Sequence, residues 1–215
     1  MLKTELVIVG VQDFEAAARR LRAKYGLGCV EGFTLPGTGM GIQVVPFPSQ
    51  MLEIVGIMDR AAAEANAFGE WFLQATAQGD RLLGWSVRTD DLEGVAARLG
   101  LRPHPGVGID SSGKQWAWRT VGMERNLAFE PFLPGFFSWE DPAAIAGMYR
   151  GWMAQARHKI EAQGIAWVEV SGSASRLREW LGGEDLPVKV CDGPPAVRAV
   201  GVRTDMGVVV LGEML

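Results

Sequence analysis

One carboxylate in this chain stands in a context that could do chemistry. Glu53 interrupts MLEIVGI (51–57), a segment that is otherwise apolar and rich in β-branched residues, as expected of a strand. An unpaired carboxylate in a protein core is costly, so such a residue is exposed, bonded or functional. Because Met51, Glu53 and Val55 share one strand face, Glu53 faces either a functional cavity or solvent.

Aromatic residues gather in the second half of the chain. In GKQWAWRTVG (113–122), strand alternation places Trp116 and Trp118 on one face and Arg119 on the other. An aromatic concave surface binds flat or apolar small molecules, and an arginine can anchor a ligand carboxylate. The alternative is that these aromatic side chains form part of the hydrophobic core and pack against the connecting helices. The candidate ligand-binding residues are Trp116, Trp118, Trp85, Arg119 and Phe129.

Other catalytic patterns are weak. The chain has two histidines, and we expect His104 in a loop between prolines and His158 on the surface of a helix. The sequence contains no G-x-S-x-G motif. GTGMG (37–41) follows a proline and predicts a hairpin or loop rather than a phosphate-binding turn between a strand and a helix. Catalytic residues remain unassigned.

The elements that must position these residues are duplicated. VGVQDFEAAARRL (9–21) and VRTDDLEGVAARL (87–99) align without a gap and are identical at six positions. Each copy contains the end of an apolar strand, an acidic turn and an alanine-rich amphipathic helix, and short strands follow. The repeated unit is therefore predicted to be βαβββ.

Three further segments, together with the duplication, resemble a known protein family. They are VVPFPSQMLEIVGI (44–57), LLGWSVRTDDLEG (82–94) and LPGFFSWEDP (133–142). With the duplication, they resemble the glyoxalase-like branch of the vicinal oxygen chelate superfamily, which includes glyoxalase I, extradiol dioxygenases and bleomycin-resistance proteins. The resemblance implies an α+β fold in which tandem βαβββ modules curl into a glyoxalase-like cup that holds a small molecule.

The resemblance also implies where a metal ion would bind. Metal-dependent members of the superfamily place ligands on the first and last strands of each module. Here the first-strand positions hold Leu6 and Gly84, which cannot bind a cation, while the last strands offer Glu53 and either Glu130 or Phe129. Two carboxylates make a poor site for Zn²⁺ or Fe²⁺, which normally recruit imidazole. We therefore expect no cofactor, with a divalent metal ion held by Glu53 and Glu130 as the alternative.

The C-terminal part is predicted to form a third βαβββ-like unit, and an unrelated α+β tail is the alternative. Such a unit needs cover for its strand edges, either from its own chain or from a second copy, and we expect a homodimer. The predicted organisation is a glyoxalase-like domain over 1–141 (modules 1–58 and 81–133, joined by a helix over 60–77), a connector helix over 142–164 and the third unit over 165–215.

Composition narrows the class of protein. The 215-residue chain is 48% hydrophobic, enough for a full core. Its net charge of −4, without a cluster of Lys or Arg, argues against nucleic acid as a partner. No apolar run approaches the ~18 residues that a membrane span needs, and the N-terminus does not resemble a signal peptide, so a cytoplasmic location is expected.

Two functions agree with these observations. The first is a non-enzymatic binder, similar to the bleomycin-resistance type, that holds a small, largely apolar or aromatic molecule in a cup with a degenerate metal site. The alternative is a divalent-metal-dependent glyoxalase-like enzyme, a lyase, isomerase or dioxygenase, that uses Glu53. The sequence does not identify the ligand.

Overall fold

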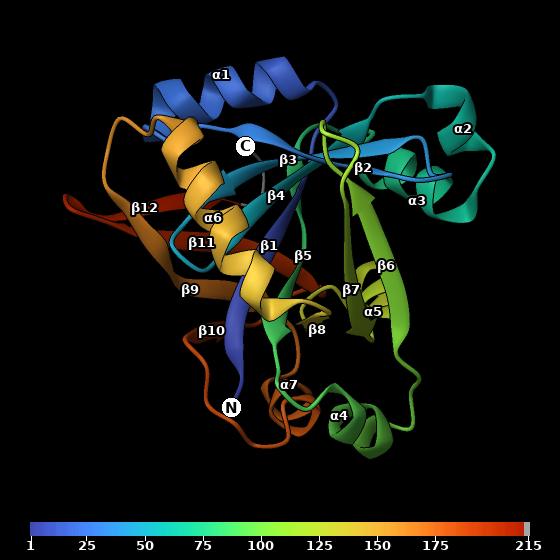
Figure 1. The fold of residues 1–215 in the computed structure, drawn as a ribbon. Coiled ribbons are helices and arrows are strands. Elements are labelled where there is room, and N and C mark those ends of the chain that lie inside the picture. The colour runs from blue at the N-terminus through green and yellow to red at the C-terminus, as the bar shows by residue number, and fades with distance from the viewer. Residues whose placement is uncertain (213–215) are drawn as a thin grey trace.

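The first module contributes half of a closed barrel. The computed structural model describes residues 1–212, and its first four strands run in the order β1-β4-β3-β2, with β4 parallel to β1 (Figure 1). The elements of this module are β1 (Lys3–Gly10), α1 (Phe14–Tyr25), β2 (Val30–Leu35), β3 (Met40–Pro46) and β4 (Met51–Ile57).

The second module repeats the arrangement. Its strands run β6-β7-β8-β5, with β8 parallel to β5, and the β1–β5 and β2–β6 pairs close the barrel. The predicted duplication is therefore visible in the strand pairing. The elements are β5 (Arg81–Arg88), α4 (Leu92–Leu99), β6 (His104–Ile109), β7 (Gln115–Val121), α5 (Met123–Phe129) and β8 (Gly135–Trp139).

The repeated acidic turn starts a helix in both modules. Asp13 accepts a hydrogen bond from the Ala16 amide at 2.9 Å, and Asp91 accepts one from the Gly94 amide at 2.8 Å. A carboxylate at the N-cap satisfies an otherwise unpaired amide and favours the positive end of the helix dipole. The aspartate that recurs before the helix in each repeat is therefore explained by helix capping.

One predicted strand is a helix. The segment RNLAFEPF (125–132), which contains Phe129 and Glu130, was expected to be the last strand of the second module, but α5 occupies much of it and β8 closes the module beside β5. Gly122 adopts φ 76, a left-handed conformation that suits glycine and turns the chain out of β7. The helix then buries Leu127 inside the barrel core.

The connecting helices are shorter than predicted. The expected helix over 60–77 is broken into α2 (Arg60–Glu64) and α3 (Ala67–Ala75), because the Asn66 side chain caps a new helix by accepting from the Gly69 amide at 2.8 Å. The connector α6 (Pro142–Ala156) begins at the predicted residue, with Asp141 as its N-cap, but it ends before residue 164, at Arg157, whose φ is 48°.

The third unit has the predicted element order but a different strand pairing. Its sheet runs β10-β9-β11-β12, with β10 parallel and β11 antiparallel to β9, whereas in the first module the last strand is parallel to the first. Its elements are β9 (Ala162–Ser171), α7 (Ala174–Trp180), β10 (Val188–Cys191), β11 (Ala196–Thr204) and β12 (Gly207–Gly212).

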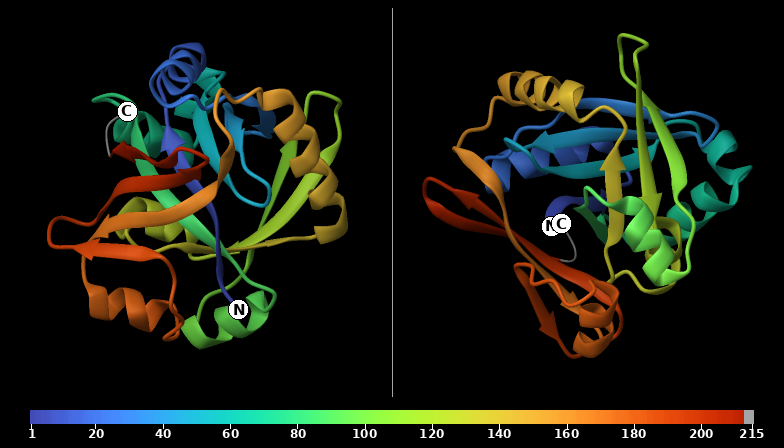
Figure 2. Two further views of the ribbon diagram at one scale, coloured as in Figure 1. Left: turned by 90° about the vertical axis from the view of Figure 1, so that its left-hand side faces the viewer. Right: turned by 60° about the horizontal axis from the view of Figure 1, so that its bottom comes forward.

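Two hydrophobic cores follow from the two faces of the barrel strands. On β1, Val7 and Val9 pack outward against the sheet of the third unit, while Leu6 and Ile8 point into the barrel. Buried residues of α6 belong to the inner core, and α6 contacts β2 and β3. Figure 2 shows α6 and the third unit on opposite sides of the first module's strands. The third unit therefore covers the barrel within its own chain.

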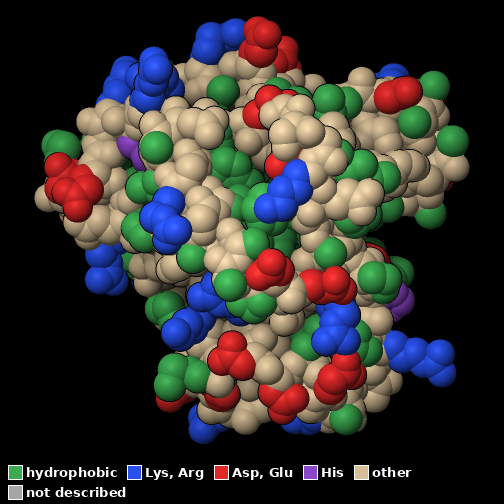
Figure 3. Space-filling model, in the orientation of Figure 1, with side chains coloured by type: hydrophobic (Ala, Val, Ile, Leu, Met, Phe, Trp, Pro, Cys, Tyr) green, Lys and Arg blue, Asp and Glu red, His purple; other side chains and the backbone are tan. Residues whose placement is uncertain are grey.

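The lengths of the helices and the distribution of charged side chains on the surface bear on where the protein could bind a partner or a membrane. Among residues 1–212, no helix is long and apolar enough to cross a membrane. On the face shown in Figure 3, Lys and Arg side chains are scattered, while hydrophobic side chains gather between α6 and the β6–β7 hairpin.

Candidate functional site

A cavity that is large enough for a small molecule opens among the barrel strands and the helices beside them. Its volume is about 350 Å³, and it lies among β1, β4, β5, β7, α3 and α5. This size is within the range of small-molecule sites. The wall is mainly aliphatic and aromatic, and its aromatic members are Phe68, Trp71, Phe72, Trp118 and Phe137.

Glu53 faces this cavity. Strand β4 places it on the same face as Met51 and Val55, which belong to the inner core, as alternation predicted. Glu53 is partly buried and, within the described chain, makes no hydrogen bond or ion pair. Burial, with a smaller contribution from the nearby Glu5 carboxylate, raises the pKa of Glu53 to about 7. A carboxyl group in this state can gain or lose a proton near neutral pH.

Glu5 lies behind Glu53 in a network that the sequence analysis missed. One of its oxygens accepts hydrogen bonds from Trp139 Nε1 and Tyr149 Oη, each at 3.0 Å, and the other lies 3.3 Å from Arg88 Nη1. Burial raises the pKa of Glu5 above its ordinary value, although Arg88 and the two hydrogen bonds oppose the shift. Glu5 is completely buried, and within residues 1–212 its second oxygen has the ion pair with Arg88 but no hydrogen bond.

A bulge explains why Glu5 points inward. Thr4 pairs with Val87 and Leu6 pairs with Ser86, so Glu5 is an extra residue in β1. Strict alternation would place it outside with Val7. The available signal was a charged residue in the apolar run TELVIVG.

The residues around Glu53 do not form the ligand set of a transition metal. Leu6 and Ile8 occupy the adjacent strand, and the Glu5 carboxylate is held by two hydrogen bonds to one oxygen and by the ion pair of the other with Arg88. Over residues 1–212, no group of three or more His, Cys, Asp and Glu side chains is arranged to hold a metal ion. Zn²⁺ and Fe²⁺ sites require more donors than one free carboxylate provides.

Trp116 and Trp118, which were predicted to share one strand face, have different surroundings. Trp118 lines the cavity and stacks on Phe137, with 6.2 Å between ring centroids. Trp116 packs at the edge of the inner core but outside the cavity wall, and its Nε1 donates to Asp110 at 2.8 Å. Thr120, on the same strand face, also lines the cavity.

The remaining predicted ligand-binding residues lie outside the cavity. Trp85 packs in the outer core, because a bulge near Leu83 shifts the alternation of β5. Arg119 points away from the barrel interior and pairs with Glu93 of α4 at 2.5 Å. Phe129 is 76% exposed at the end of α5, since its segment is helical rather than extended.

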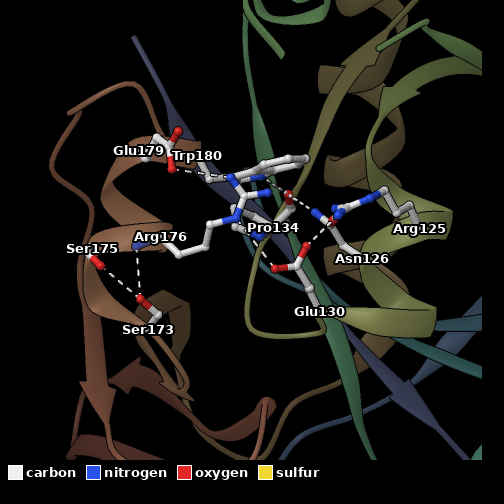
Figure 4. Close-up of polar contacts among 9 residues, drawn as sticks. All are labelled: Arg125, Asn126, Glu130, Pro134, Ser173, Ser175, Arg176, Glu179 and Trp180. Atoms are coloured by element: carbon white, nitrogen blue, oxygen red, sulfur yellow. Dashed lines mark hydrogen bonds and ion pairs between the residues drawn. The ribbon is translucent and has the colours of Figure 1, made fainter. Parts of the chain in front are cut away.

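Glu130, the second predicted metal ligand, joins two parts of the fold instead. Its carboxylate lies 2.7 Å from Arg125 Nη2 and 3.6 Å from Arg176 Nε of α7, as Figure 4 shows. Nearby, Trp180 Nε1 and Asn126 Nδ2 donate to the Pro134 carbonyl at 2.8 and 3.0 Å. These contacts attach α5, which carries part of the cavity wall, to the third unit.

Neither histidine is part of the cavity wall, although His104 pairs with Thr120, which is. His104 is exposed at the start of β6, whereas His158 is partly buried rather than on the surface as predicted. The Gly28 amide donates to His158 Nδ1 at 3.0 Å, and Nε2 lies 3.0 Å from the Pro46 carbonyl. Burial lowers the pKa of His158. It joins the end of α6 to the first module.

Sequence comparison agrees with this architecture. Residues 7–183 match the family model described as a glyoxalase-like domain. The chain belongs to this family. The predicted glyoxalase-like, vicinal oxygen chelate resemblance is thereby confirmed. No significant sequence match was found among curated proteins.

Solved structures share the fold of this glyoxalase-like protein. A hypothetical protein from Staphylococcus aureus is 13% identical, with a TM-score of 0.66 over 92% of this chain and 88% of that chain. That similarity extends into the third unit and supports the predicted fold class.

Two methylmalonyl-CoA epimerases are also similar at 15% identity. The enzyme from Mycobacterium tuberculosis has a TM-score of 0.44 and covers 67% of this chain and 91% of its own. A variant of the Streptomyces coelicolor enzyme, in complex with 2-nitronate-propionyl-CoA, has a TM-score of 0.45. The match covers 65% of this chain and 98% of that chain.

Proposed function

We propose that this glyoxalase-like protein binds a small, largely apolar or aromatic molecule inside its barrel. The observation that carries the proposal is the cavity of about 350 Å³, whose wall is hydrophobic apart from a few polar groups. An apolar cavity with one directed polar group is the usual form of a small-molecule site, because burial supplies affinity and the polar group supplies orientation.

Trp118 and Glu53 have different roles in this proposal. The ring of Trp118 supplies a flat apolar surface, and stacking on Phe137 fixes its orientation. Glu53 supplies the polar contact, since its carboxyl group faces the cavity without a protein partner. Neither role requires a metal ion.

A panel of three aromatic probes tests the proposal. The probes are neutral 4-tert-butylphenol, cationic (4-hydroxyphenyl)trimethylammonium and anionic 4-tert-butylbenzoate, each titrated by calorimetry. We expect saturable binding of at least one probe, and weaker binding by Val55→Trp, which adds a large side chain to the cavity wall. Circular dichroism establishes that this variant is folded. The proposal fails if no probe binds at millimolar concentration, or if a folded Val55→Trp variant binds as wild type does.

A metal-dependent enzyme is the second candidate. The favouring observation is that Glu53 faces the cavity from β4, the last strand of the first module, where the family resemblance implies a metal ligand. Element-specific metal analysis of protein purified without a polyhistidine tag separates the two candidates. We expect no tightly bound transition metal, because one free carboxylate is a weak site. About one equivalent per chain that survives dialysis and disappears in Glu53→Ala would support the enzyme instead.

A further inference from the structure

The charged side chains that line the cavity are all acidic. Among residues 1–212, the charged residues in its wall are Glu53 and Glu124, and no Lys, Arg or His lines it. Thr38 and Thr120 also line the cavity, but the Thr38 hydroxyl donates to the Leu35 carbonyl and accepts from the Met40 amide. A ligand inside the cavity therefore meets acidic side chains but no basic side chain of residues 1–212.

The Glu53 carboxylate in the cavity wall has no counter-charge among residues 1–212. Glu53 forms no ion pair with any described residue, and the nearby Glu5 carboxylate adds to the negative potential. Arg88 is the nearby cation, but it pairs with Glu5 and lies outside the cavity wall. A buried carboxylate without a counter-charge is unfavourable, and a cation entering the cavity would relieve this cost.

The aromatic rings favour the same kind of ligand. Phe68 and Trp71 stack with 5.5 Å between centroids on α3, and Trp118 and Phe137 stack on the barrel strands. The face of an aromatic ring carries partial negative charge and attracts ammonium groups, most strongly where water is excluded. The four rings thus add to the attraction from Glu53.

We infer that the cavity selects small organic cations, either protonated amines or quaternary ammonium compounds with an apolar or aromatic body. The positive group lies beside Glu53, and the apolar body fills the space between the aromatic side chains. This inference rests on the proposed binding function and names the class of ligand.

The inference is tested by ranking two probes of nearly identical shape. In (4-hydroxyphenyl)trimethylammonium and 4-tert-butylphenol, the same ring carries a trimethylammonium or a tert-butyl group, so they differ chiefly in charge. We expect the cation to bind about tenfold more tightly to the wild-type protein, the effect of one desolvated contact with a carboxylate and an aromatic face. Glu53→Gln should reduce this ratio to about threefold or less. Glu124→Gln is the matched control, because Glu124 is exposed on the cavity wall, and it should keep most of the preference.

The outcomes distinguish the inference from the proposed function. Equal or tighter binding of 4-tert-butylphenol by the wild-type protein would overturn the inference and leave the binding function in place. An undiminished preference for the cation in Glu53→Gln would overturn the role assigned to Glu53. Failure of both probes and of 4-tert-butylbenzoate to bind would overturn the binding function, and the inference with it.

Discussion

The carboxyl group of Glu53 takes up a proton more readily in the folded chain than in the unfolded chain. Its pKa rises from 4.5 to about 7, so the folded state binds more protons between these values and stability falls as the pH rises through them. Glu53→Gln removes this cost. We predict that the variant is more stable than wild type at pH 8, by as much as about 3 kcal/mol, and equally stable at pH 4.

Urea denaturation at the two pH values measures this effect. Glu31→Gln is a suitable control, because Glu31 is exposed on β2 and its replacement should change stability little at either pH. A destabilised Glu53→Gln variant at pH 8 would contradict the described surroundings of Glu53.

Trp118 and Trp85 make a matched pair of tryptophans for a second prediction. Trp118→Phe should weaken probe binding several-fold while costing about 1 kcal/mol of stability or less, because its ring already borders open space. Trp85→Phe should keep probe binding but cost about 1–3 kcal/mol, since it leaves the buried Phe132 carbonyl without its 3.1 Å donor. Calorimetry and thermal melts measure both. Unchanged probe binding with a large loss of stability in Trp118→Phe would show that Trp118 serves packing and not ligand binding.

Alternation predicts some side-chain directions and fails at bulges. The shared face of Met51, Glu53 and Val55 could be predicted because β4 has no register shift against β1 or β3. Glu5 and Trp85 could not be placed, because extra residues in β1 and β5 change which face the next side chain takes. Bulge positions depend on pairing between distant strands, which one strand's own pattern does not contain.

At the scale of elements, α5 depends on the third unit for its position. Glu130, just after α5, pairs with Arg176 of α7, and the Arg176 guanidinium lies 5.4 Å from the centroid of the Trp180 ring (Figure 4). We predict that Glu130→Gln costs about 1 kcal/mol or less, since partly exposed ion pairs contribute little, but accelerates hydrogen exchange of the α5 amides. Mass spectrometry of deuterium uptake measures this.

Glu93→Gln is the matched control for that experiment. Glu93 also pairs with an arginine, Arg119, but on α4, which carries no residue of the cavity wall. Its replacement should leave exchange in α5 unchanged. Equal acceleration in both variants, or in neither, would contradict a specific attachment through Glu130.

Helix starts were more predictable than helix ends. Asp13 and Asp91 of the repeated acidic turn act as N-caps of the predicted helices, and Asp141 caps α6 directly before Pro142. The break at Asn66 and the end of α6 at Arg157 had weaker signals: an asparagine is common within helices, and Arg157 holds a left-handed conformation that its residue type does not predict. The α5 segment was misassigned because a seven-residue helix is too short to show a helical period clearly.

At the scale of the whole molecule, the third unit shares a core with the barrel. Val168, Val200 and Val202 of its sheet pack in the same cluster as Val7 and Val9 of β1. Removing the third unit would therefore expose the outer face of the barrel, and truncation cannot separate assembly from folding. Its two sheet edges, β10 and β12, have no strand partner in the described chain.

Strand β12 is the edge that best fits a second copy of the chain. Val208 and Val210 are each 48% exposed, and an apolar edge strand is a ready template for antiparallel pairing about a two-fold axis. We predict a homodimer at micromolar concentration by light scattering, which becomes a monomer when both Val208→Lys and Val210→Lys are introduced. Val190→Lys, on the opposite edge at β10, should remain dimeric. A monomeric wild-type protein would contradict the homodimer, whereas a dimer that persists in the double variant would place the interface away from β12.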